Sequence, residues 1–179
     1  MHAIPTPLSA DTESLVGQIG TADLLVGIPS FNNAGTIGHV VRAVSAGLAK
    51  YFPEHRAVLV NADGGSTDGT PIVVTTTMVD LDLLLITDQP DTLHRIVTPY
   101  HGIPGKGSAF RTIFEIARRL NVHACAVVDS DLRSITPEWI ELLLRPVVQL
   151  RQQWRLVLVE QAFLGGLQVA VAGARPPDV

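Results

Sequence analysis

The sequence predicts an α/β fold in which a mostly parallel sheet carries helices on both faces. Short apolar runs alternate along the chain with segments whose apolar residues recur at helical spacing. Alternation of this kind favours parallel strands joined by crossover helices. The chain has 179 residues, of which 46% are hydrophobic and 17% are charged, so it can bury the core of one compact domain and is not a disordered protein.

The first half of the chain predicts two strand–helix units. Residues 24–29 form an apolar run that ends at a turn signal, and residues 37–48 carry apolar side chains at helical spacing. Residues 57–62 form a second apolar run, which leads into a glycine-rich turn. Pro71 then suits the first turn of a helix, where its missing N–H costs nothing.

The second half predicts more strands and two more helices. The strand candidates are residues 81–86, 95–98, 124–129 and 155–159. The first of them could instead close the preceding helix. Residues 109–120 show helical spacing, and Thr136 followed by Pro137 is a strong helix start, with the threonine as cap and the proline at the first helical position.

One domain is expected over residues 23–160. A lead-in segment with one short helix, residues 1–22, precedes it, and residues 161–179 form a tail of unclear role. The chain starts without the pattern of a signal peptide and holds no convincing membrane span, so the cytoplasm is the default location. The net charge of −4 disfavours nucleic acid or an anionic membrane as the main partner. The single cysteine, Cys125, lies in an apolar run and suits a buried position.

Three polar clusters follow predicted strands. Residues 30–33 follow the first strand, residues 63–68 follow the second, and residues 129–131 follow a later one. In open parallel sheets, ligands bind beyond the carboxyl ends of the strands. We therefore expect the three clusters to form one site.

Asp129 and Asp131 place two carboxylates on alternate residues after a strand. Such carboxylates can converge on Mg²⁺ or Mn²⁺, which would neutralise a diphosphate and stabilise it as a leaving group. An aspartate here could equally cap a turn or the next helix. Aspartate-nucleophile phosphatases share the pattern, but usually at their first strand and with Thr or Val where this chain has Arg133.

Gly105, Lys106 and Gly107 combine a flexible backbone with a positive charge just before a predicted helix, which suits an anion. A P-loop would need glycine in place of Tyr100 and serine or threonine in place of Gly107, so this is not a P-loop. A solvated loop lysine is the alternative interpretation.

Two further loops could be plain turns or parts of a nucleoside site. After the first strand, Ser30 and the backbone could face a nucleoside, with Phe31 packed below it. After the second strand, Asp63 could accept a hydrogen bond from a base N–H while the glycines let the ring lie close. In a plain turn, Thr67 or Asp68 would cap the next helix.

Together these motifs resemble the GT-A glycosyltransferases. The pattern is a strand ending in P-x-[FY]-N, a second ending in D-x-G-S-T-D-G-T and a later one ending in D-x-D. The segment IPGKGSAF ahead of VVDSDL narrows the resemblance to glucosyl-3-phosphoglycerate synthases and the related mannosylglycerate-type synthases. The resemblance covers about residues 23–147 and implies a Rossmann-like GT-A nucleotide-sugar-binding domain.

The resemblance implies a metal-dependent enzyme that transfers a hexose from UDP-glucose or GDP-mannose to a small hydroxylated acceptor such as glycerate or its phosphate. It implies that Asp131, aided by Asp129, binds Mg²⁺ or Mn²⁺. From the residues and the resemblance together, the expected nucleotide-sugar contacts are Pro29, Ser30, Phe31, Asn32, Asp63, Gly65, Ser66, Gly105, Lys106, Asp129 and Ser130.

The sequence also departs from the family. Asn33 replaces a common glutamate and Gly64 replaces a second acidic residue, which leaves the base and ribose contacts open. Family members are usually much longer and commonly carry a late histidine that completes the metal shell, whereas no histidine follows His123. No catalytic base is identified. We therefore expect a truncated chain, a small donor-binding relative or a form completed by homo-oligomerisation.

The alternative function is a non-catalytic nucleotide-sugar-binding domain. A third hypothesis, a nucleotidyltransferase of similar fold, would require a glycine-rich loop with arginine after the first strand. The segment PSFNNAGT does not supply that loop.

Overall fold

The computed structural model describes residues 8–84, 93–99, 105–149 and 169–172. The helices in these ranges are α1 (Ala10–Ile19), α2 (Ile37–Tyr51), α3 (Thr70–Leu84), α4 (Lys106–Arg119) and α5 (Pro137–Gln149). The strands are β1 (Leu24–Ser30), β2 (Ala57–Asp63), β3 (Leu93–Thr98), β4 (Ala124–Val127) and β5 (Val169–Ala172). Strands and helices alternate from β1 to α5, as the sequence predicts.

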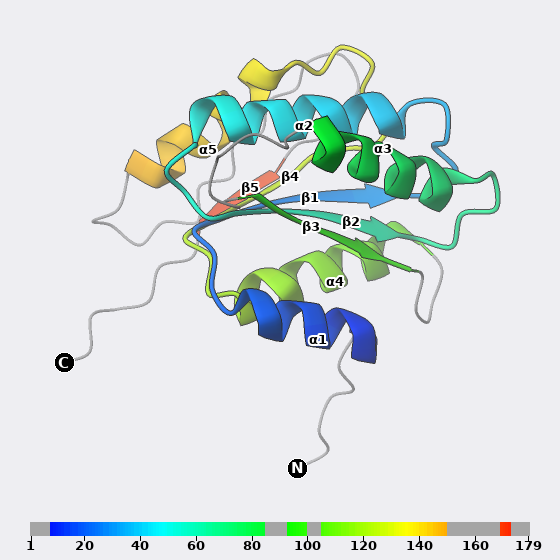
Figure 1. Cartoon of the computed structure of the whole chain (residues 1–179), viewed down its shortest axis with the longest axis horizontal. Helices are drawn as coiled ribbons and strands as arrows, with labels where there is room; N and C mark the ends of the chain where they lie inside the picture. The colour runs from blue at the N-terminus through cyan, green and yellow to red at the C-terminus, as the bar shows by residue number, and fades with distance from the viewer. Residues whose placement is uncertain (1–7, 85–92, 100–104, 150–168, 173–179) are drawn as a thin grey trace.

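The described strands form one sheet in the order β3-β2-β1-β4-β5. Strands β1 to β4 are parallel, and β5 pairs antiparallel with β4. Figure 1 shows three layers, with α2, α3 and α5 over one face of the sheet and α1 and α4 over the other. The predicted α/β fold, Rossmann-like and with a mostly parallel sheet between helices, is confirmed.

The central strands are buried along their whole length because helices cover both of their faces. Every residue of β1 and β2 is buried, which is the usual pattern for parallel strands of this kind. One apolar cluster joins the sheet to α2, α3 and α5, and a second joins it to α1 and α4. Gly27 in β1 permits the close approach of α4, since a Cβ there would lie 2.4 Å from a methyl carbon of Ile113.

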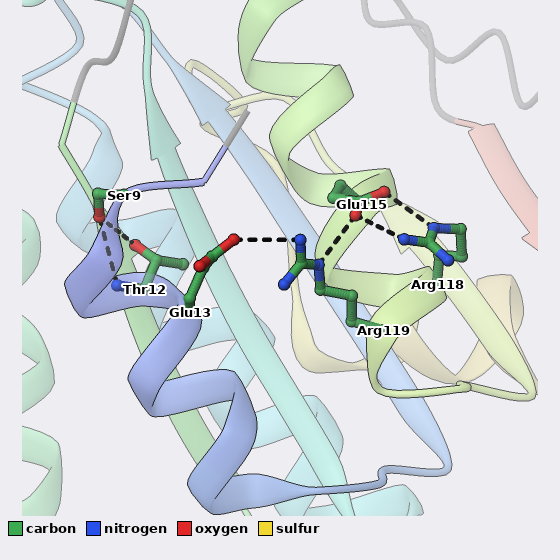
Figure 2. Close-up of polar contacts among 6 residues, drawn as sticks. All are labelled: Ser9, Thr12, Glu13, Glu115, Arg118 and Arg119. Atoms are coloured by element: carbon green, nitrogen blue, oxygen red, sulfur yellow. Dashed lines mark hydrogen bonds and ion pairs between the residues drawn. The ribbon is translucent and has the colours of Figure 1, made fainter. Parts of the chain in front are cut away.

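Helix α1 lies in the stretch expected to form a lead-in segment. Ser9 caps the helix, because its Oγ accepts a hydrogen bond of 3.3 Å from the Thr12 N–H. Glu13 of α1 forms an ion pair of 3.1 Å with Arg119 of α4 (Figure 2). Val16 is buried in the cluster beneath α1 and α4. Helix α1 therefore packs onto the same core as the sheet.

Glu115 of α4 lies between two arginines (Figure 2). Its Oε1 accepts a hydrogen bond of 2.7 Å from Arg118 and one of 2.9 Å from Arg119. These hydrogen bonds lower the pKa of Glu115 from 4.5 to about 2, and those from Arg118 have the largest effect, followed by the bond from Arg119. Because the folded-state pKa is depressed, the ionised carboxylate stabilises the fold above its ordinary pKa. That contribution is lost as the pH falls from about 4.5 to about 2.

We predict that Glu115→Gln lowers the free energy of unfolding at neutral pH by less than about 1 kcal/mol, as for most exposed ion pairs. The difference from the native chain should shrink below pH 4.5, because the native carboxylate then loses its charge in the unfolded state and later in the folded state. Urea unfolding at several pH values measures this. If the two free energies of unfolding differ by the same amount down to the lowest pH, the stabilisation by Glu115 does not come from its charge.

Most element boundaries agree with prediction to within a few residues. Strand β4 ends at Val127, although the Val128 N–H still donates a hydrogen bond of 2.9 Å to the Gly27 carbonyl. Residues 81–84 continue α3, so the helical alternative holds for that part of residues 81–86. The strand candidate at residues 155–159 lies outside the described residues. Strand β5 lies in the stretch predicted as a tail of unclear role.

No helix in the described ranges combines the length and apolar character that a membrane crossing requires.

Candidate functional site

The carboxyl ends of the parallel strands lie along one edge of the sheet. Strands β2 and β3 lie on one side of β1, and β4 lies on the other side, so the strand order reverses at β1. Such a switch point is where open α/β sheets bind their ligands. The polar clusters after β1, β2 and β4 come together there.

A pocket of about 270 Å³ opens at this switch point. It is lined by Pro29, Ser30, Phe31, Asn33, Gly105, Lys106, Asp129, Ser130 and Asp131. All of these except Asn33 are among the nucleotide-sugar and metal contacts expected from the sequence, and Asn33 lies in the polar cluster at residues 30–33. The other expected contacts, Asn32, Asp63, Gly65 and Ser66, belong to the adjoining loops after β1 and β2 and are not among the lining residues.

Asp63, the last residue of β2, organises the loop that follows it. Its Oδ2 accepts hydrogen bonds from the N–H groups of Gly65 and Ser66, at 2.9 and 2.8 Å. Its Oδ1 accepts from the hydroxyls of Ser66 and Ser30, at 2.6 and 3.3 Å. An ionised carboxylate has about four lone-pair sites, and the protein occupies all of them. A nucleobase N–H could therefore bond to Asp63 only by displacing one of these donors.

Asn32 joins the loop after β1 to the loop after β2. Its N–H donates a hydrogen bond of 2.9 Å to Ser66 Oγ, and its Oδ1 accepts one of 2.9 Å from the Thr67 N–H. Asp68, one of the two predicted caps, fills the capping role, because its Oδ1 accepts a hydrogen bond of 3.0 Å from the Thr70 N–H at the start of α3. These hydrogen bonds join the two loops to each other beside the pocket.

Asn33 links the pocket loops to one another; it belongs to the polar cluster at residues 30–33 but is not among the expected nucleotide-sugar contacts. Its Oδ1 accepts hydrogen bonds from the Phe31 N–H at 3.0 Å and from the Ser130 hydroxyl at 2.7 Å. Its own N–H donates a bond of 2.8 Å to Thr70 Oγ1. The sequence carries two signals for Asn33: its place in the polar cluster after the first strand, and its replacement of the glutamate common in the resembled family. Its contact with Ser130 spans 97 residues.

The two aspartates after β4 differ in exposure. Asp129 is buried, with 8% of its surface exposed, whereas Asp131 is exposed. The Lys106 Nζ lies 2.5 Å from Asp129 Oδ1. Ser130 between them is held on both sides, since its hydroxyl bonds to Asn33 and its carbonyl accepts a bond of 2.9 Å from Thr36 Oγ1.

Helix α4 begins at the pocket with Lys106 as its first residue. Its N-terminus has no side-chain cap and no acidic residue in the first turn. Gly105 precedes it with φ of 127°, a conformation that favours glycine, and its N–H lies 3.4 Å from the Gly64 carbonyl. The positive end of the helix and the lysine together suit an anion.

The residues of the pocket fit a hard divalent cation. The described residues include no group of three or more histidine, cysteine or acidic side chains that could hold a metal ion by themselves. Two carboxylates, Asp129 and Asp131, nevertheless line the same pocket. Mg²⁺ is typically bound by one or two carboxylates together with water and substrate phosphates, so two carboxylates suffice for such a site.

No protein-family model matches the sequence, and no curated protein matches it. Among solved structures, the chain is similar to glucosyl-3-phosphoglycerate synthase from Mycobacterium tuberculosis in complex with Mn²⁺, UDP and glucosyl-3-phosphoglycerate. The TM-score is 0.49 and the identity 22%, over 74% of this chain and 43% of that chain. The same enzyme with Mg²⁺ and UDP gives a TM-score of 0.48 at 22% identity, with the same coverage of both chains. Its complex with Mn²⁺, UDP-glucose and glycerol 3-phosphate gives the same values. The chain spans less than half the length of these enzymes.

Proposed function

We propose that this chain binds a nucleoside-diphosphate sugar through a divalent cation and acts as a metal-dependent glycosyltransferase of the GT-A type. The proposal depends on one observation: a single pocket carries both two carboxylates and a lysine at an uncapped helix N-terminus. A cation and an anion that bind together satisfy both halves of this pocket. A metal-bound diphosphate has that charge pattern.

The carboxylates and the lysine would bind different parts of the metal–donor complex. Asp129 and Asp131 would hold Mg²⁺ or Mn²⁺, which would stabilise the charge that appears on the departing diphosphate. Lys106 and the first N–H groups of α4 would bind the phosphate oxygens from the other side. At about 270 Å³ the pocket lies near the lower limit of ligand pockets, roughly 300 Å³, so the nucleoside and the sugar would extend beyond it.

The loops after β1 and β2 would position the nucleoside. Pro29, Ser30 and Phe31 line the pocket next to the phosphate-binding groups. Asp63 would act mainly by holding the loop at Gly65 and Ser66 in shape, because the protein already uses all its acceptor sites. As donors we propose UDP-glucose or GDP-mannose, and as acceptor a small hydroxylated molecule such as glycerate or its phosphate.

A non-catalytic nucleotide-sugar-binding domain is the second candidate. It is favoured because the ionisable residues that line the pocket, Lys106, Asp129 and Asp131, all have binding roles in the proposal, which leaves no general base among them. The two candidates predict the same metal-dependent binding. They differ in whether the sugar is transferred, or the donor slowly hydrolysed, in a reaction that EDTA stops.

The test is calorimetry of UDP, GDP, UDP-glucose and GDP-mannose with and without Mn²⁺. We predict that the native chain binds one nucleotide series in a metal-dependent manner. Asp131→Ala should reduce the affinity to the value measured without metal, because one of two carboxylate ligands is removed. Asp80→Ala, which removes an exposed carboxylate from α3, is the matched control and should bind as the native chain does. Nucleotide binding that does not depend on Mn²⁺ in the native chain, or a gain in affinity with Mn²⁺ that persists in Asp131→Ala, would exclude the proposed site.

A further inference from the structure

Lys106 and Asp129 form a close but unequal ion pair. The ammonium lies 2.5 Å from Asp129 Oδ1, while 60% of the lysine side chain and only 12% of the aspartate side chain are exposed. The aspartate side chain is therefore packed among its neighbours, whereas the long lysine side chain can rotate into solvent or into the pocket. The lysine backbone is anchored, because the preceding Gly105 N–H lies 3.4 Å from the Gly64 carbonyl.

A divalent cation at Asp129 would meet the lysine ammonium directly. If it took Oδ1, the two cations would lie on the same oxygen and repel each other strongly. If it took Oδ2 of the same carboxylate, it would still lie close to the ammonium and be repelled by it. In either case, Lys106 opposes metal binding as long as it stays paired with Asp129.

A diphosphate would remove this opposition. Its oxygens would lie between the metal ligands and the N-terminus of α4, since Lys106, Asp129 and Asp131 line one pocket. The ammonium could then leave Asp129 for a phosphate oxygen by side-chain rotation alone, and the carboxylate would be free for the metal. Nucleotide binding would in this way favour metal binding, and the coupling would be reciprocal.

We propose that Lys106 is a tethered cation that competes with the divalent metal for Asp129 and gives up that position when a nucleoside diphosphate binds. The inference rests on the proposed function and adds a regulation to the same site. Lys106 thereby suppresses loading of the metal without nucleotide and couples the binding of the two ligands.

The experiment measures the Kd for Mn²⁺ from the electron paramagnetic resonance signal of free Mn²⁺, with and without saturating UDP or GDP. Lys106→Met should bind Mn²⁺ alone at least about five-fold more tightly than the native chain, the lower end of typical coupling strengths. The ratio between the Kd values with and without nucleotide should shrink by a similar factor. Lys106→Arg, which retains the cation, should resemble the native chain.

The chain offers a matched control for the change in net charge. Lys50, the other lysine of the sequence, pairs with Glu138 at 3.3 Å on an exposed surface of α2 and α5. Lys50→Met should leave both Mn²⁺ affinities unchanged. Lys106 is largely exposed, so its replacement should keep the fold, which thermal unfolding of each variant verifies.

Two results would overturn the inference in different ways. If Mn²⁺ binds but Lys106→Met leaves the nucleotide-free affinity unchanged or weakens it, the competition is refuted and the proposed function stands. If no variant binds Mn²⁺ with or without nucleotide, both the competition and the proposed function are refuted.

Discussion

Gly47→Ala is expected to lower the free energy of unfolding by up to about 2 kcal/mol, because overpacking a tight contact costs roughly 1–3 kcal/mol and the better helix propensity of alanine offsets about 1 kcal/mol. Gly47 is a buried residue of α2 that faces α5. A Cβ at this position would lie 2.7 Å from Ile140 Cβ, from its Cγ1 and from the Pro137 carbonyl oxygen. Neither the carbonyl nor the Cβ can swing away, so α5 would have to move off α2.

Gly17→Ala is the matched control, because Gly17 is a helical glycine of α1 whose added Cβ would have no atom within 4 Å beyond the adjacent residues and backbone of its own helix. Because the added Cβ causes no steric clash at this position, only the better helix propensity of alanine remains. The same chemical change should therefore raise the free energy of unfolding by up to about 1 kcal/mol. Guanidinium unfolding of both variants gives the two values. If Gly47→Ala is as stable as Gly17→Ala, α2 and α5 do not pack as closely as the structure places them.

The sheet could be predicted because its central strands carry a strong local signal. Residues 24–29 and 57–62 are mainly apolar runs, interrupted only by Asn61 in the second, and both become strands that are buried on two sides. The helix starting at Pro137 carried an equally local signal, the Thr136-Pro137 pair. In each case, the residues that reveal the element lie within it or next to it.

Strand β5 is not predicted by the sequence, which assigns this stretch to the tail. Its four residues, Val169–Ala172, form a strand by pairing with β4, some 45 residues earlier in the chain. These residues are few and weakly patterned, so they form a strand only because the edge of the sheet at β4 is available for pairing. The local sequence does not reveal that edge.

The sequence names eight of the nine residues that line the pocket but not the contacts among them. The rule that ligands bind beyond the carboxyl ends of parallel strands brought Ser30, Asp63 and Asp129 into one region. Lys106 was added by its glycine loop and by the family resemblance. The rule could not reveal that Asn33 joins Phe31 to Ser130, because that contact depends on the relative height of two loops. It also could not reveal that Lys106 and Asp129 form an ion pair, because that contact depends on the conformation of both side chains.

Asp63→Ala is expected to lower the free energy of unfolding by about 2–4 kcal/mol, because several hydrogen bonds to one charged and buried acceptor are lost together. Asp63 is 7% exposed, and the Gly65 and Ser66 N–H groups would have no protein acceptor in its absence. Hydrogen exchange provides a local measurement. Both amides should be protected in the native chain and exchange much faster in Asp63→Ala, while amides in β4 keep their protection until global unfolding.

Asp63→Asn and Asp80→Ala separate loop support from a direct contact with the nucleoside. The asparagine retains one acceptor oxygen, so the stability loss and the faster exchange at Gly65 and Ser66 should both be intermediate. Asp80→Ala, a change of the same chemistry on the exposed side of α3, should alter neither. Because the loop that Asp63 holds adjoins the pocket, nucleotide affinity should fall in parallel with the loss of amide protection. A variant that keeps its stability and amide protection but loses nucleotide binding would show that Asp63 contacts the nucleoside itself.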